Sequence, residues 1–152
     1  MRIESPAFED GESIPAVYTC DGKNINPPLR FIDIPAETVT LALIVEDPDV
    51  PRKIRTDGTW DHWVVWNIPP TITEVGENEL PTGNYGANSS GEEKYEGPCP
   101  PDGEHRYYFR LYALDAELTL KPGSTKAKLL NAIHGHVIAD ATLLGRYTRI
   151  AQ

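Results

Sequence analysis

Four side chains that could do chemistry stand at the ends of apolar, strand-like runs of the sequence. Asp47 follows TLALIVE, His62 opens HWVVWNIPP, and His105 and Tyr107 open HRYYFRLYALD. Imidazolium and phenol groups donate hydrogen bonds, and a nearby carboxylate favours the charged form of a histidine. Brought to one place, these groups would suit the binding of a small anion. We expect that binding to strengthen as the pH falls toward the histidine pKa, because imidazolium is the better anion partner.

The apolar pattern predicts the strands that must position these side chains. Short β-branched and aromatic runs lie between 14 prolines and 12 glycines, a pattern typical of a mostly antiparallel β domain. Residues 40–46 are apolar at both alternating sets of positions, which indicates a central strand covered on both sides. Residues 62–68 are similar: Trp63 and Trp66 fall on opposite faces, and His62 falls on the face of Trp66.

The pairing of these two strands predicts where the acid and the first histidine meet. If the strands run antiparallel, the end of the first lies beside the start of the second, so Asp47 comes close to His62. Residues 47–61 then form a lobe at that end of the sheet, and Trp60 could form a wall beside His62. Two ionisable groups at the mouth of an apolar core need a partner or a purpose.

A third strand is predicted from His105 to Asp115, after a turn stiffened by prolines at positions 98, 100 and 101. Alternation places His105 and Tyr107 on one face, about 7 Å apart by strand geometry. Taken singly, an aspartate before a proline is a common turn residue, and buried histidine and tyrosine are common packing residues. Because three strand ends supply these residues together, we interpret the group as a site.

Two other stretches carry predictions about local structure. Apolar residues at helical spacing begin after Ser124 or Thr125, and we expect two short helices divided by Gly135, with Gly145 capping the second. The polar, glycine-rich stretch 69–97 is expected to be a long connection without regular structure that lines a site.

Composition bounds the class of protein. The 152 residues, 39% of them hydrophobic, predict a single globular domain over residues 1–152. A net charge of −9 without a basic run argues against a nucleic-acid partner. The N-terminus has no signal-peptide pattern, and no apolar run approaches the roughly 20 residues of a membrane span, so we expect a cytoplasmic protein.

The histidines and cysteines outside the site predict neither a metal nor a cofactor. His134 and His136 are two residues apart, so on a helix they would point away from each other. Cys20 and Cys99 lack metal-ligand spacing and are too few for a disulfide framework. Two reduced thiols are the favoured interpretation, and a pair that meets in space stays open.

Three blocks, EDPDVP, WDHWVVWNIP and GPCPPDGEHRYYFRLYALD, occur in this order and resemble the signature blocks of the phosphatidylethanolamine-binding protein family, which includes Raf kinase inhibitor protein. The block TCDGKNINPPLRF and the compact ending are similar to its shorter bacterial and archaeal branch. The resemblance implies an all-β domain with a large antiparallel sheet packed on a smaller one, plus short helices near the C-terminus. It places an anion pocket at Asp47, Trp60, His62, Cys99, Pro100, His105 and Tyr107.

The leading functional hypothesis is a binding module, not an enzyme, that holds a phosphate or a phosphorylated ligand. A hydrolase of esterase or phosphatase type is the alternative, with Cys99 as the reactive residue nearest to the expected pocket. A third hypothesis is an inhibitor that binds a kinase or protease through the exposed stretch 47–61 or 76–97. A homodimer is compatible with all three hypotheses.

Overall fold

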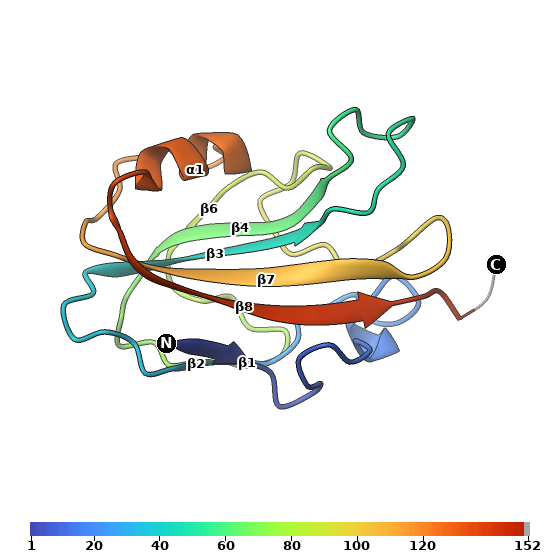
Figure 1. Ribbon diagram of the computed structural model, residues 1–152, viewed down its shortest axis with the longest axis horizontal. Helices are drawn as coiled ribbons and strands as arrows, with labels where there is room; N and C mark the ends of the chain where they lie inside the picture. The colour runs from blue at the N-terminus through green and yellow to red at the C-terminus, as the bar shows by residue number, and fades with distance from the viewer. Residues whose placement is uncertain (151–152) are drawn as a thin grey trace.

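The computed structural model describes residues 1–150 and consists of two antiparallel β-sheets and one short α-helix (Figure 1). The large sheet has the strand order β6-β4-β3-β7-β8, with bounds Asn84–Tyr85, Trp60–Ile68, Thr40–Asp47, His105–Leu114 and Val137–Tyr147. The small sheet has the order β1-β2-β5, with bounds Arg2–Glu4, Leu29–Ile32 and Glu74–Val75. The helical elements are the 3-10 turn η1, Ala16–Tyr18, and the helix α1, Lys126–Ile133. The prediction of a mostly β fold with a large and a small antiparallel sheet is confirmed.

Strand β3 is central, and both of its faces are buried as predicted. The face with Leu43 and Val45 packs into the core between the two sheets. The face with Ala42 and Ile44 packs into a second core beneath α1, which covers the other side of the large sheet (Figure 1). The same two layers separate the tryptophans of β4, because Trp63 belongs to the first core and Trp66 to the second.

The prediction of a second C-terminal helix is wrong, because residues 137–147 form strand β8. Helix α1 begins as expected: the Thr125 hydroxyl accepts a hydrogen bond from the Lys128 N–H at 3.3 Å. The chain then turns at Gly135, whose φ of +82° suits glycine, and β8 pairs with β7. Strand β8 lies at the edge of the large sheet and exposes Val137 and Ile138, so its apolar residues do not alternate regularly and the strand pattern in the sequence is weak.

The N-terminal segment completes the C-terminal half of β8. The Ile14 N–H donates to the Arg146 carbonyl at 2.8 Å, and the Arg146 N–H donates to the Glu12 carbonyl at 3.0 Å. Gly145 lies in this contact and caps no helix: a Cβ there would lie 2.5 Å from Ile14 Cγ1. The glycine therefore permits close packing of the N-terminal segment on the sheet.

The stretch 69–97 contains two short strands, so the prediction that it lacks regular structure is wrong. Strand β5 pairs with β2 in the small sheet, and β6 pairs with β4 in the large sheet. The stretch therefore contributes an edge strand to each sheet before it reaches the site at Glu96 and Gly97. Within residues 1–150, no helix has the length and apolarity that crossing a bilayer requires.

Candidate functional site

A cavity of about 220 Å³ opens at the end of the large sheet where β3 ends and β4 and β7 begin. Its lining consists of Asp47, Val50, Ile54, Trp60, His62, Glu96, Gly97, Cys99, Pro101 and Tyr107. Five of the seven expected site residues are among them: Asp47, Trp60, His62, Cys99 and Tyr107. Of the other two, Pro100 is buried outside the lining, with Pro101 at the cavity wall, and His105 lies behind Asp47.

A β-bulge brings His62 into this cavity. In the antiparallel pairing of β3 and β4, Glu46 lies opposite Asp61 and Val45 lies opposite Trp63, so His62 is an extra residue. The bulge turns His62 to the cavity side of the sheet, where its ring meets the Tyr107 ring edge-on with centroids 5.3 Å apart. The predicted strand pairing is therefore confirmed, but the predicted face of His62 is wrong, because simple alternation does not hold across a bulge.

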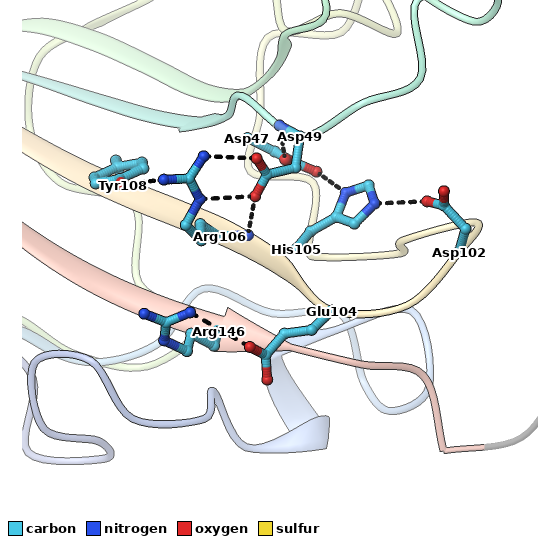
Figure 2. A network of polar contacts seen from close by, with 8 residues as sticks. All are labelled: Asp47, Asp49, Asp102, Glu104, His105, Arg106, Tyr108 and Arg146. Atoms are coloured by element: carbon cyan, nitrogen blue, oxygen red, sulfur yellow. Dashed lines mark hydrogen bonds and ion pairs between the residues drawn. The ribbon is translucent and has the colours of Figure 1, made fainter.

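His105 is bonded through both ring nitrogens (Figure 2). Its Nδ1 lies 2.6 Å from Asp47 Oδ2, and its Nε2 lies 2.8 Å from Asp102 Oδ1. Burial alone would lower the pKa of His105, but the two carboxylates outweigh burial and raise this pKa above its ordinary value. The imidazolium therefore donates to both acids and has no N–H left for a ligand while Asp102 stays in place.

A second acid of the same turn, Asp49, fixes the lobe 47–61 to β7. Its carboxylate accepts two hydrogen bonds from the Arg106 guanidinium, at 2.7 and 3.0 Å, and a third from the Arg106 backbone N–H at 2.9 Å (Figure 2). The bonds from Arg106 lower the pKa of Asp49. Its N–H in turn donates to Asp47 Oδ1 at 2.7 Å. Sequence reasoning missed this pair, although both residues are next to predicted site positions.

His62 and Tyr107 form the floor of the cavity. The Nδ1 of His62 lies 2.6 Å from the Glu96 carbonyl oxygen, which can only accept, so Nδ1 carries the proton. Burial lowers the pKa of His62. Burial also raises the pKa of Tyr107, together with the charge of the Asp47 carboxylate, which lies near the Tyr107 hydroxyl. Both rings are therefore neutral near pH 7. Among the described residues, neither His62 Nε2 nor the Tyr107 hydroxyl has a hydrogen-bond partner, although both atoms are buried.

The lobe 47–61 gives the cavity an apolar side. Val50, Ile54 and Trp60 line it from the lobe 47–61, and the Arg55 guanidinium lies 5.5 Å from the centre of the Trp60 ring. The lining therefore combines this apolar side with the side chains of His62 and Tyr107, and Arg55 is not among the lining residues.

The two cysteines form a disulfide, so the favoured prediction of two reduced thiols is wrong. The turn that begins at Gly97 packs beside the segment that contains Cys20: the Cys20 N–H donates to the Pro98 carbonyl at 3.1 Å. Because the cysteines are 79 positions apart, the sequence gives no local sign of this contact. The disulfide fixes the cavity wall at Cys99 and removes Cys99 as a candidate nucleophile.

Fold and cavity together define a two-sheet β protein with a preformed pocket of polar and apolar residues at one end of its large sheet. The family model for phosphatidylethanolamine-binding proteins matches residues 4–148, and the chain belongs to this family. This finding confirms the resemblance that the three sequence blocks indicate.

Similar proteins come from both bacteria and archaea. A UPF0098 protein of Methanothermobacter thermautotrophicus is 50% identical over 155 residues, which cover 98% of this chain and 99% of that protein. A UPF0098 protein of Chlamydia pneumoniae is 49% identical over 149 residues, with 98% and 99% covered.

Two crystal structures share the fold over nearly the whole chain. A phosphatidylethanolamine-binding protein homologue from Chlamydia trachomatis is 48% identical, with a TM-score of 0.95 and 97% of each chain covered. YBCL of E. coli, described as a member of the mammalian PEBP family, is 30% identical, with a TM-score of 0.87 and 97% and 98% covered.

Proposed function

We propose that this protein binds a small phosphorylated ligand in the cavity at the end of the large sheet and acts as a binding protein. The observation that carries the proposal is the pair of buried polar atoms on the cavity floor, His62 Nε2 and the Tyr107 hydroxyl, which lack partners among residues 1–150. Buried polar groups are normally hydrogen-bonded, and leaving one unpaired costs about 1–3 kcal/mol. A ligand that bonds to both atoms would recover this cost.

The size of the cavity favours a phosphoryl group. About 220 Å³ suits a head group better than a larger molecule, since pockets for drug-sized ligands reach about 300–1,000 Å³. The His105 imidazolium, 2.6 Å from Asp47, compensates the charge of this residue, which is one of the two acidic residues of the lining. The family's name refers to a phospholipid whose head group contains a phosphoryl group, which agrees with this choice.

Titration with inorganic phosphate and methyl phosphate, followed by NMR and calorimetry, tests the proposal. We expect shifts at the Tyr107 and His62 resonances, and about tenfold weaker binding in Tyr107→Phe, because one hydrogen bond to a charged ligand is lost. Tyr112→Phe is the matched control, since Tyr112 lies on the opposite face of the same strand β7. Equal affinities of the wild type and Tyr107→Phe would contradict the proposal.

The alternative of a hydrolase with Cys99 as its nucleophile is not supported, because Cys99 is bonded to Cys20. An inhibitor of a kinase or protease is a second candidate, supported by the lobe 47–61, which projects beyond the sheet and exposes 48% of Ile54 (Figure 1). If the lobe alone contacts such a partner, His105→Ala would leave inhibition intact while it changes ligand binding.

A cytoplasmic location and a homodimer remain predictions for this protein. Disulfides such as Cys20–Cys99 persist mainly in oxidising compartments, so the thiol state in intact cells bears directly on the location. Alkylation of the protein before lysis, followed by mass spectrometry, reports whether the two cysteines are reduced where the protein resides.

A further inference from the structure

We propose that the cavity selects oxyanions that carry a proton, with His62 Nε2 as the acceptor of the P–OH hydrogen bond. This inference rests on the proposed function, because it assigns the protonation state of the phosphorylated ligand. It also makes His62 the residue that determines which oxyanions bind, because its Nε2 offers a lone pair and carries no positive charge.

The tautomer of His62 is set by its backbone partner. The Glu96 carbonyl oxygen, 2.6 Å from Nδ1, accepts a hydrogen bond and has no proton to give. The ring is buried and neutral, so the proton sits on Nδ1 and the lone pair on Nε2. In the part of the chain that the structure describes, nothing donates to this lone pair, and His62 lines the cavity.

The other polar groups of the site leave no alternative donor at the same position. His105 donates both of its N–H groups to Asp47 and Asp102. Asp47 accepts from His105 through Oδ2 and from the Asp49 N–H through Oδ1. Tyr107 lines the cavity beside His62, and its buried hydroxyl has no hydrogen-bond partner among the described residues. A ligand hydroxyl fits this pair, because it can donate to His62 Nε2 while another ligand oxygen accepts from Tyr107.

Several charged groups around His62 could alter its protonation, and they come from every element packed against it. They are Asp47 from β3, Asp61 from β4, Glu96 from the stretch before β7, and His105 and Tyr107 from β7. The carboxylates favour a charged His62, but burial outweighs them and lowers its pKa. The acceptor state of Nε2 therefore persists through neutral pH.

This geometry separates oxyanions of similar size. Inorganic phosphate keeps at least one P–OH near neutral pH, whereas sulfate has no proton to donate. A phosphate monoester loses its last P–OH with a second pKa of about 6. An oxygen without a proton would face the Nε2 lone pair in a buried site, and sites that hydrogen-bond a hydroxyl reject analogues without it by up to about 10⁴-fold.

The experiment measures the affinity of the wild-type protein for inorganic phosphate, methyl phosphate, sulfate and methylammonium at about pH 6 and about pH 8. We expect phosphate to bind at both pH values and sulfate to bind at least about tenfold more weakly at both. The affinity for methyl phosphate should fall more than about tenfold from pH 6 to pH 8, because the fraction of its protonated form falls by more than that factor.

The possible outcomes distinguish the selectivity for protonated oxyanions from the proposed function as a phosphate-binding protein. Sulfate binding as tightly as phosphate, or methyl phosphate binding equally at both pH values, would overturn the selectivity and leave the proposed function in place. If none of the three anions binds at either pH, both claims fail. Binding of methylammonium without any anion would assign the cavity to a cation and would also overturn both.

A His62 variant and NMR spectra of the imidazoles test whether the selectivity for phosphate over sulfate depends on His62. His62→Phe keeps a ring beside Tyr107 but removes the acceptor, so phosphate should lose its advantage over sulfate, while the exposed control His134→Gln should keep it. If His62→Phe does not fold, ¹H–¹⁵N spectra of the wild-type imidazoles decide: Nε2 of His62 should stay unprotonated and shift when phosphate binds. A protonated Nε2 in the phosphate complex would contradict the proposal.

Discussion

The two buried histidines of the site lie in opposite electrostatic surroundings. His105, at the wall behind the cavity, is held between two carboxylates, which raise its pKa despite burial. His62, on the cavity floor, has a neutral carbonyl as its partner at Nδ1, and burial lowers its pKa. Two imidazoles near one pocket can therefore differ in function. The charged His105 stabilises the surrounding structure, and the neutral His62 offers a free lone pair to a ligand.

The largest expected effect comes from removing the buried partner of His105. Asp47→Ala leaves the imidazolium without its buried counterion and the Asp49 N–H without its acceptor, so we expect a loss of about 3–5 kcal/mol in the free energy of unfolding. Urea denaturation measures this loss. A change below about 1 kcal/mol would show that the pair does not hold the scaffold.

The disulfide tests whether the cavity can be disturbed separately from the contacts of His105 with its two acids. Replacing both Cys20 and Cys99 with serine should lower the free energy of unfolding by about 2–4 kcal/mol, because the crosslink constrains a long loop of the unfolded chain. Because Cys99 lines the cavity, phosphate affinity should fall as well, while the NMR titration of His105 should stay nearly the same. A large shift of the His105 pKa in this variant would contradict the separation of the two regions.

The pH dependence of stability should carry opposite contributions from the two rings. His105, with a raised pKa, stabilises fully below its unfolded value of about 6.5, and this stabilisation is lost as the pH rises through its higher folded value. His62, with a lowered pKa, costs stability as the pH falls below about 6.5, because the unfolded chain binds the proton more readily. In urea denaturation from about pH 5 to pH 8, His62→Phe should therefore lose less stability toward acid than the wild type. If the free energy of unfolding falls equally toward low pH in the variant and the wild type, His62 is not held neutral.

The smallest effect is expected for the exposed partner of His105. The side chain of Asp102 is 67% exposed, so Asp102→Asn should change the free energy of unfolding by less than about 1 kcal/mol. It should still lower the His105 pKa measured by NMR, because one of the two carboxylates is lost. Equal destabilisation by Asp102→Asn and Asp47→Ala would remove the distinction between the buried and the exposed partner.

Much of the architecture could be predicted because it depends on local patterning. The doubly apolar runs of β3 and β4 require a central position, and their antiparallel pairing places Asp47 near His62. The alternation from His105 onward also holds, since His105, Tyr107, Phe109 and the core positions that follow are buried.

The remaining features depend on contacts between distant segments. The bulge at His62 comes from the register between two strands, and neither strand shows it alone. The disulfide joins residues 79 positions apart. Strand β8 resembles a helix in the sequence because its apolar residues also fit a helical spacing, and only its long pairing with β7 decides the outcome. A hydrogen bond between His105 and Asp102 could be suspected from their spacing. The sequence does not show that this bond uses the second ring nitrogen of His105, which is then not available to a ligand.

The N-terminal segment that hydrogen-bonds to β8 has a consequence for how the protein behaves in solution. The exposed border of a sheet is a template onto which a strand of another molecule can add, the usual route to self-association and fibres. Near the end of β8, the backbone groups of Arg146 are already hydrogen-bonded to Glu12 and Ile14, so another strand cannot pair there. The first fourteen residues thus shield this part of their own sheet from neighbouring molecules, and losing them would expose the border while it removed β1 from the small sheet.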